Sequence, residues 1–168
     1  MPRRKPTQRQ HPQHPQRTYT LVHELLAHPT RPIPEPKRLH QLTVMWQALR
    51  SIETEPTPTR SDWRVVSDAV NLLETLVGMG EVTDASGLLP DAVEALASAA
   101  RRHLQTQASI RLSGAGIHAV RAVLEDYACA LTALPERTLV RCHRLTELRI
   151  ANILAGKGQA HDIEVVDL

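Results

Sequence analysis

Four arginines near the carboxyl end of the chain have the residue type and the spacing to bind phosphate groups. Arg137, Arg141 and Arg144 follow one another at intervals of four and three residues, and Arg149 comes five residues later. On a helix, this spacing places the first three side chains on one continuous face. Guanidinium groups in such a row neutralise phosphates and release counterions, which is the chemistry of nucleic-acid binding. The alternative is the closing helix of a bundle that is basic on its solvated side.

A second basic group lies at the amino end. Residues 1–17 carry five Lys or Arg and no acid, and after Met1 their only apolar residues are prolines. Such a segment buries too little apolar surface to offset the entropy lost on ordering, so it is expected to be disordered. Arg3, Arg4 and Lys5 are its candidate phosphate contacts. A solvated tail without a ligand is the alternative.

The charges and prolines divide the chain into a tail and a body. Residues 1–60 carry ten Lys/Arg against four Asp/Glu, whereas residues 61–168 carry ten against fourteen. Ten of the twelve prolines lie in residues 1–58. We therefore expect three parts: a basic Pro/Gln-rich tail over residues 1–17, a single helical domain over 18–156 and a short C-terminal tail over 157–168.

Apolar residues recur with helical periodicity over most of the body. With 42% hydrophobic residues, 2% aromatic residues and no Phe, the core must be built from Leu, Val, Ile and Ala. Short connections between the periodic segments predict an all-α antiparallel bundle of five to six helices. The predicted helices span residues 18–28, 38–53, 61–80, 87–105, 116–134 and about 136–155.

The first predicted helix carries its apolar residues on one face, and Thr18 is in position to cap it. A short strand is the alternative for this segment. Ser61 is the expected cap of the third helix. Residues 29–37, with four prolines, are predicted to be an extended connector, and residues 108–116 a four-residue strand or a plain loop. The apolar face of the first helix consists of Leu21, Val22, Leu25 and Leu26.

The helical stripes also predict the core. Leu39 and Leu104 are placed on buried stripes of the second and fourth helices. Both cysteines, Cys129 and Cys142, are expected to be buried free thiols, because Cys packs as a small hydrophobe. The residues expected to be buried most firmly are Trp63, Val70, Leu73, Leu124, Tyr127 and Leu131.

No arrangement of residues indicates catalysis or a metal. GAGIHA, residues 114–119, matches the G-x-G-x-x-A pattern of dinucleotide-binding turns, but the chain offers no second strand for the parallel sheet that this motif needs. Cys142 and His143 are adjacent, and adjacent helical side chains point about 100° apart, so they cannot form a thiolate–imidazole pair. His143 is instead expected to be a buried, hydrogen-bonded core histidine. The sequence therefore predicts no enzyme, no cofactor and no metal site.

The stretch ALTALPERTLVRCHRL, within residues 130–149, resembles the recognition half of Fis-like helix-turn-helix regulators. Leu134–Glu136 stands for the turn, Arg137–Leu139 for the step that follows it, and Arg141 and Arg144 for the basic positions. The chain departs from that pattern at Pro135, where glycine is usual, in a preceding helix about twice the expected length, and at Glu147 on the basic side. The resemblance implies DNA contacts by Arg137, Arg141, Arg144 and Arg149.

These observations predict a small, cytoplasmic, non-enzymatic helical binding protein. Nucleic-acid binding through the C-terminal helix and the basic arm is the leading interpretation. The alternative is a protein-interaction module, for example a phage or mobile-element inhibitor of a host defence complex, as anti-CRISPR proteins are. No stretch of 18 apolar residues is present, so no membrane span is expected. The oligomeric state stays open, a dimer included.

Overall fold

The computed structural model describes residues 18–157, which form six helices and no strand, as the sequence predicted. Both tail segments, 1–17 and 158–168, lie outside the described residues, so the predicted disorder of the first is not addressed. The helices are α1 (Leu21–Leu26), α2 (Glu35–Thr54), α3 (Arg60–Gly78), α4 (Leu89–Thr106), α5 (Gly114–Ala133) and α6 (Glu136–Leu154).

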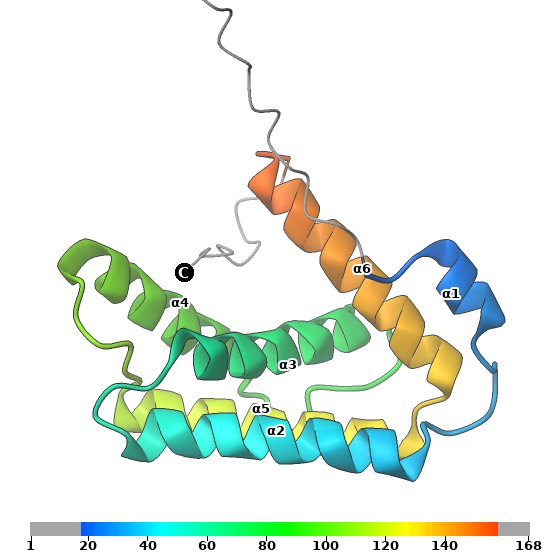
Figure 1. Ribbon diagram of the computed structural model, residues 1–168, viewed down its shortest axis with the longest axis horizontal. Helices are drawn as coiled ribbons and strands as arrows, with labels where there is room; N and C mark the ends of the chain where they lie inside the picture. Colours follow the sequence, from blue (N-terminus) through cyan, green and yellow to red (C-terminus); the bar gives the residue numbers. More distant parts are fainter. Residues whose placement is uncertain (1–17, 158–168) are drawn as a thin grey trace, which may run out of the picture.

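Helix α3 lies at the centre and packs against α2, α4, α5 and α6. In Figure 1, α2 and α5 run along one edge of the molecule, while α4 and α6 rise toward the other side at opposite ends. The core between them is aliphatic, and its most fully buried side chains include Val66, Leu73 and Leu124. All six residues of the predicted core are buried, which confirms the faces assigned to α3 and α5.

The most fully buried aromatic ring in the core, that of Tyr127, has a partner for its polar atom. The amide of Gln41 donates a hydrogen bond to the Tyr127 hydroxyl at 2.7 Å. Burial raises the pKa of Tyr127 well above its usual value. The phenol therefore stays protonated, and its burial leaves no unpaired polar atom in the core.

Two N-terminal caps differ from the predicted ones. Thr20, not Thr18, caps α1, and Thr59, not Ser61, caps α3. In the second case Asp62 decides the outcome: its backbone N–H donates to Thr59 at 3.1 Å, and its carboxylate accepts from the Thr59 N–H at 3.0 Å. This reciprocal pair needs a spacing of three residues, which Ser61 cannot provide with Asp62.

Prolines and loops set the remaining boundaries. Helix α2 begins at Glu35, inside the predicted connector, because Pro36 lies in the first turn, where no N–H donor is required. Between α4 and α5 the chain forms a loop, the second of the two predicted alternatives. Gln107 begins this loop with φ of 56°, and Ile110 anchors it in the core.

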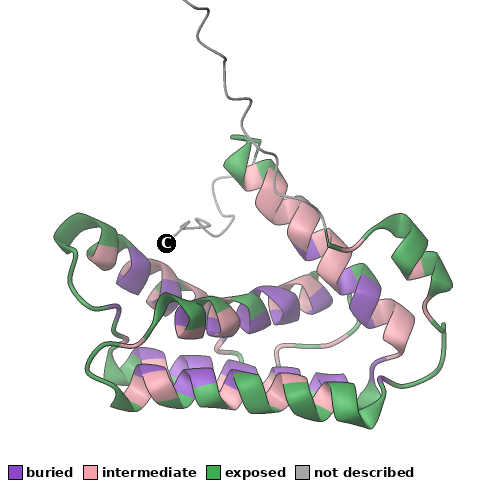
Figure 2. Ribbon diagram, in the orientation of Figure 1, coloured by how far each residue is buried: buried purple, intermediate pink, exposed green. Residues whose placement is uncertain are grey.

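Several residues on the predicted stripes do not face the core. Leu39 and Leu104 are half exposed. Leu104 lies in the last turn of α4, at the end that extends away from the other helices (Figure 2). On α2, the buried residues are Met45, Ala48, Leu49 and Ile52.

Only one of the two free cysteines is buried, which corrects the prediction for Cys129. Cys129 follows the buried Tyr127 by two positions, about 200° around the helix, and therefore faces solvent. Cys142 is buried between α6 and α3, where its thiol donates to the Leu72 carbonyl at 3.3 Å. Burial raises the pKa of Cys142 to about 12, so this thiol stays protonated.

The glycine turn at the start of α5 serves packing. A Cβ at Gly116 would lie 2.9 Å from the Cβ of Ala95 on α4, closer than two such atoms approach, whereas a Cβ at Gly114 would meet nothing within 4 Å. Ser113 caps the helix by accepting from the Gly116 N–H at 3.0 Å. Gly116 therefore allows α5 to pack closely on α4.

We predict that Gly116→Ala destabilises the protein and that Gly114→Ala does not. Both changes gain similar helix propensity, so their difference isolates the clash with Ala95, expected at about 1–3 kcal/mol. Urea unfolding of the two variants measures this difference. Equal free energies of unfolding would contradict the close packing of α4 on α5.

Candidate functional site

The predicted arginines lie on α6, whose first turn is tied to the segment before α2. The N–H of Glu136 donates to the Arg31 carbonyl at 2.9 Å, and that of Arg137 donates to the His28 carbonyl at 3.1 Å. These amides have no acceptor within their own helix. The Arg31 and Glu136 side chains form an ion pair beside them at 2.9 Å. The chain just after α1 is therefore fixed to the start of α6, and α1 packs along α6 (Figure 1).

Arg137 caps the carboxyl end of α1. Its guanidinium donates from Nε to the Ala27 carbonyl at 3.0 Å and from Nη2 to the Leu25 carbonyl at 3.1 Å. The last carbonyls of a helix lack internal partners and carry partial negative charge. Arg137 therefore satisfies the end of α1 rather than projecting into solvent.

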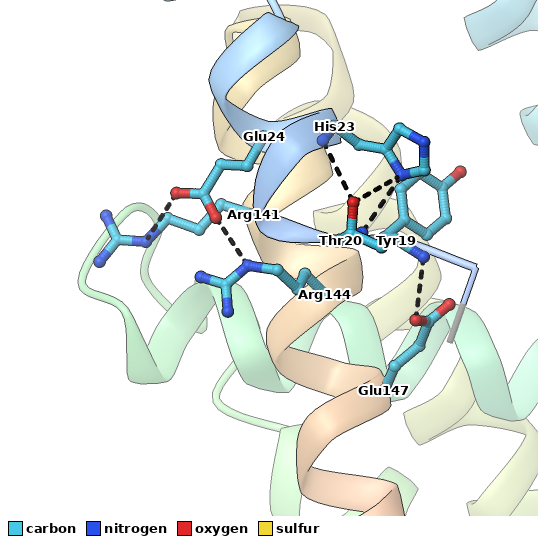
Figure 3. A network of polar contacts seen from close by, with 7 residues as sticks. All are labelled: Tyr19, Thr20, His23, Glu24, Arg141, Arg144 and Glu147. Atoms are coloured by element: carbon cyan, nitrogen blue, oxygen red, sulfur yellow. Dashed lines mark hydrogen bonds and ion pairs between the residues drawn. The ribbon is translucent and has the colours of Figure 1, made fainter. Parts of the chain in front are cut away.

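Arg144 and Arg141 both turn toward Glu24, in the middle of α1 (Figure 3). The Arg144 guanidinium donates to the Glu24 carboxylate at 2.7 Å, and the Glu24 side chain is only 14% exposed. Arg141 stands farther off, 3.9 Å from the other oxygen, and is 52% exposed. Glu24–Arg144 is therefore the strong pair, and Arg141 adds a weaker, screened attraction.

The amino end of α1 is held by a ring contact and one hydrogen bond. The Tyr19 ring stacks on the His143 ring with 4.6 Å between centroids, and the Tyr19 N–H donates to the Glu147 carboxylate at 3.1 Å. His143 is thus half-buried beneath Tyr19 and is not the core histidine that was predicted. Burial, aided by the nearby charge of Lys37, lowers the pKa of His143 to about 4.

Arg149 does not join the other three arginines. It pairs with Glu74 on α3 and donates to the Asn71 carbonyl at 3.4 Å. The structure therefore brings Arg137, Arg141 and Arg144 together on the side of α6 that faces α1, and turns Arg149 toward the bundle. The other candidate residues, Arg3, Arg4 and Lys5, lie outside the described residues.

These contacts use the polar side of α1 and leave its apolar side in solvent. We call Leu21, Val22, Leu25 and Leu26 the α1 face; they are 57%, 61%, 63% and 79% exposed. Figure 2 shows α1 as an almost wholly exposed helix beside α6. A surface helix ordinarily turns its apolar stripe inward. In α1 this orientation is reversed, so its apolar face lies in solvent.

Sequence reasoning missed Glu24 as a site residue. The sequence held one signal for it. Glu24 is the first acid in the chain and lies in the first predicted helix, while the last predicted helix carries a row of arginines. The pairing joins residues 120 positions apart, which no local pattern predicts.

Two further findings bear on what the site can do. Within residues 18–157, no group of three or more His, Cys, Asp or Glu side chains is placed to hold a metal ion. None of the six helices combines the length and the apolar character needed to cross a membrane.

We predict that Arg144→Ala loosens α1 without unfolding the bundle. It removes a charge-assisted hydrogen bond worth about 1.5–3 kcal/mol and leaves Glu24 without its close partner. Hydrogen exchange of the α1 amides should speed up roughly tenfold or more, while the amides of α3 and α5 keep their protection. Arg141→Ala is the matched control and should change α1 exchange much less, because its contact is longer and exposed. Equal effects of the two changes would contradict the ranking of these contacts.

We also predict that His143 makes stability depend on pH. Its pKa is about 4 in the folded protein and about 6.5 in an unfolded chain. The unfolded state therefore binds more protons between these values, so stability is complete above about pH 6.5 and falls as the pH drops toward 4. Urea unfolding at pH 7.5 and at pH 4.5 gives the loss of unfolding free energy between these two pH values. We expect this loss to be larger in the wild type than in His143→Phe, by on the order of 1–2 kcal/mol. The same difference in both proteins would assign the pH dependence to other groups.

Comparison with known proteins gives no relative on which to base a function: no family model, no curated protein and no solved structure matches the chain.

Proposed function

We propose that this protein is a non-enzymatic protein-interaction module that docks the α1 face on a protein partner. The observation that carries the proposal is the orientation of α1. Four aliphatic side chains on one helix are each more than half exposed, because polar contacts fix the opposite side of that helix to α6.

The α1 face has the composition of a recognition patch, since its four exposed side chains are all aliphatic. Isolated exposed leucines are common on proteins, but a contiguous apolar patch of a few hundred square ångströms is often functional. Apolar positions at i, i+1, i+4 and i+5 suit a helix that inserts one side into an apolar groove. Burying such a patch supplies on the order of 10 kcal/mol before the costs of association.

The attachment of α1 to α6 also favours binding. Arg137 holds its carboxyl end, Arg144 its middle, and the stack of Tyr19 on His143 its amino end. A segment that is already ordered in its binding conformation loses little entropy when a partner docks. The arginines thus act as positioning residues for the α1 face.

Nucleic-acid binding, the leading interpretation of the sequence, stays a prediction with less support. Arg137, Arg144 and Arg149 donate to carbonyls or carboxylates of the chain itself, and only Arg141 of this group is exposed. A phosphate would have to displace those partners. Residues 18–157 carry fifteen Lys/Arg and fifteen Asp/Glu, so the described body has no net positive charge to attract a polyanion. An inhibitor of a host defence complex is one kind of protein-binding role that this proposal includes.

The test places a photocrosslinking amino acid at Leu26 of the full chain in its native host. We expect covalent adducts with protein, another copy of the chain included, and their loss when Leu21 and Leu25 are changed to Glu. The same probe at Leu104, an exposed leucine on α4, is the control and should give few adducts.

The absence of α1-dependent protein adducts would overturn the proposal. A mobility-shift series with DNA at rising salt tests the alternative. Binding at about 50 mM salt that Arg141→Ala weakens, but that the two Glu changes leave intact, would favour the nucleic-acid interpretation.

A further inference from the structure

We infer that the end of the bundle opposite α1 binds the phosphate backbone of a double-stranded nucleic acid. Figure 1 shows this end on the left, where α2 and α4 finish and α3 and α5 begin, while α1 lies on the right beside α6. The inference goes beyond the proposed function, because it assigns a second surface and does not involve the α1 face.

The charges of the described body are separated between this end and the rest. Residues 50–64 and 101–121, which form the end, carry seven Lys/Arg and three Asp/Glu, a formal charge of +4. The remainder of residues 18–157 carries eight and twelve, a formal charge of −4. Between Glu94 and Glu125 the chain has four arginines and no acid. A polyanion that approaches this end therefore meets a positive surface, although the described body as a whole is neutral.

Two arginines of this end are held in place by neutral acceptors. Arg102 on α4 donates from Nη2 to the Arg111 carbonyl at 2.8 Å, and Arg111 donates from Nη2 to the Pro56 carbonyl at 2.8 Å. These bonds connect the end of α4, the α4–α5 loop and the loop before α3. Arg102 and Arg111 are exposed, and within the described residues neither forms an ion pair with a carboxylate.

This environment differs from that of Arg144 on α6. The Glu24 carboxylate compensates the charge of Arg144, whereas a carbonyl leaves a guanidinium with its full charge. A guanidinium has five N–H donors, and Arg102 and Arg111 each use one of them within residues 18–157. A phosphate can therefore bind the other donors without displacing a carboxylate. Because the two guanidinium groups are already positioned, little entropy is lost when it binds.

Arg60 adds a third positive charge. It lies in the first turn of α3, four residues after the Pro56 carbonyl that Arg111 contacts. Arg60 is exposed, and its side chain makes no hydrogen bond or ion pair with any other described residue. We call Arg60, Arg102 and Arg111 the basic end.

The residues around the basic end favour a phosphate backbone as its ligand. The exposed residues from 101 to 109 are Arg, Gln, Thr and Ser, apart from Leu104 and Ala108. Guanidinium, amide and hydroxyl groups are the usual donors to phosphate oxygens, whereas the centre of a protein interface is ordinarily apolar or aromatic with few charges.

The aromatic content of this end favours a duplex over a single strand. Among Phe, Trp and Tyr, residues 50–64 and 101–121 contain only Trp63, which is buried. Proteins that bind single strands stack unpaired bases on exposed aromatic rings, and the basic end offers none. We therefore expect contacts to the backbone of a duplex, without readout of its sequence.

Fluorescence anisotropy of the full chain with two short DNA duplexes of unrelated sequence, at rising salt, tests the inference. The wild type should bind both duplexes alike at about 50 mM salt. Arg102→Gln with Arg111→Gln should weaken binding to both duplexes. It should also reduce the slope of log affinity against log salt by about two, one for each lost phosphate contact. Residues 1–17 are the same in every variant, so their contribution cancels.

Two further variants separate the basic end from net charge and from folding. Lys37→Gln with Arg141→Gln removes the same net charge from exposed positions near α6 and should leave the slope close to that of the wild type. Arg60→Gln removes a side chain on which no described contact depends, and it should reduce the slope by about one. Circular dichroism of all variants should match the wild type.

No binding of either duplex by the wild type at about 50 mM salt would overturn the inference. Equal slopes in the wild type, the Arg102, Arg111 variant and Arg60→Gln would also overturn it, because another segment would then carry the binding. Poly-glutamate that competes as well as a duplex would assign the surface to an acidic protein instead, and tighter binding of a single strand would contradict the choice of a duplex. The photocrosslinks at Leu26 test the proposed function separately, because none of these variants changes the α1 face.

Discussion

The polar contact between α1 and α6 decides which surface this protein presents. Arg137 and Arg144 each find their acceptors on α1, one at its terminal carbonyls and one at the Glu24 carboxylate. A helix with one apolar side usually packs that side inward, because burial of aliphatic surface outweighs most surface polar contacts. In α1 the polar side has charge-assisted partners in fixed positions and the helix has only six residues, so the outcome is reversed.

The same contact changes the meaning of the basic row on α6. An arginine that faces solvent can neutralise a phosphate at little cost, whereas one that already donates to a carboxylate or a carbonyl oxygen must give up a bond worth about 1.5–3 kcal/mol. Arg144 and Arg137 are in the second situation, and Arg141 is close to the first. These arginines look alike in the sequence, but they differ in the free energy needed to release each one for a phosphate. Their main effect within the molecule is to position α1.

Sequence periodicity was sufficient to predict the buried face of a helix where that face must be buried whichever helices surround it. The buried stripes of α3 and α5, including Val70, Leu73 and Leu124, follow from a 3.6-residue repeat that has no other stable placement. For α1 the same repeat identified the helix and its face but not the direction of that face. That direction depends on Glu24 meeting Arg144, a contact between segments 120 positions apart. The capping of α1 by Arg137 is likewise a tertiary contact, invisible to any local pattern.

The division between core and surface explains why α1 is free to carry the proposed binding face. None of its residues is buried, whereas every other helix contributes at least four buried residues to the packed centre. Stability therefore resides in α2 to α6, and α1 adds only its polar attachment to α6. Substitutions on the α1 face change exposed side chains and create no cavity in the core. Cavity formation, a common cause of large destabilisation, therefore does not apply to them. Residues at this surface are thus not fixed by what the fold requires, and the proposed partner can set them instead.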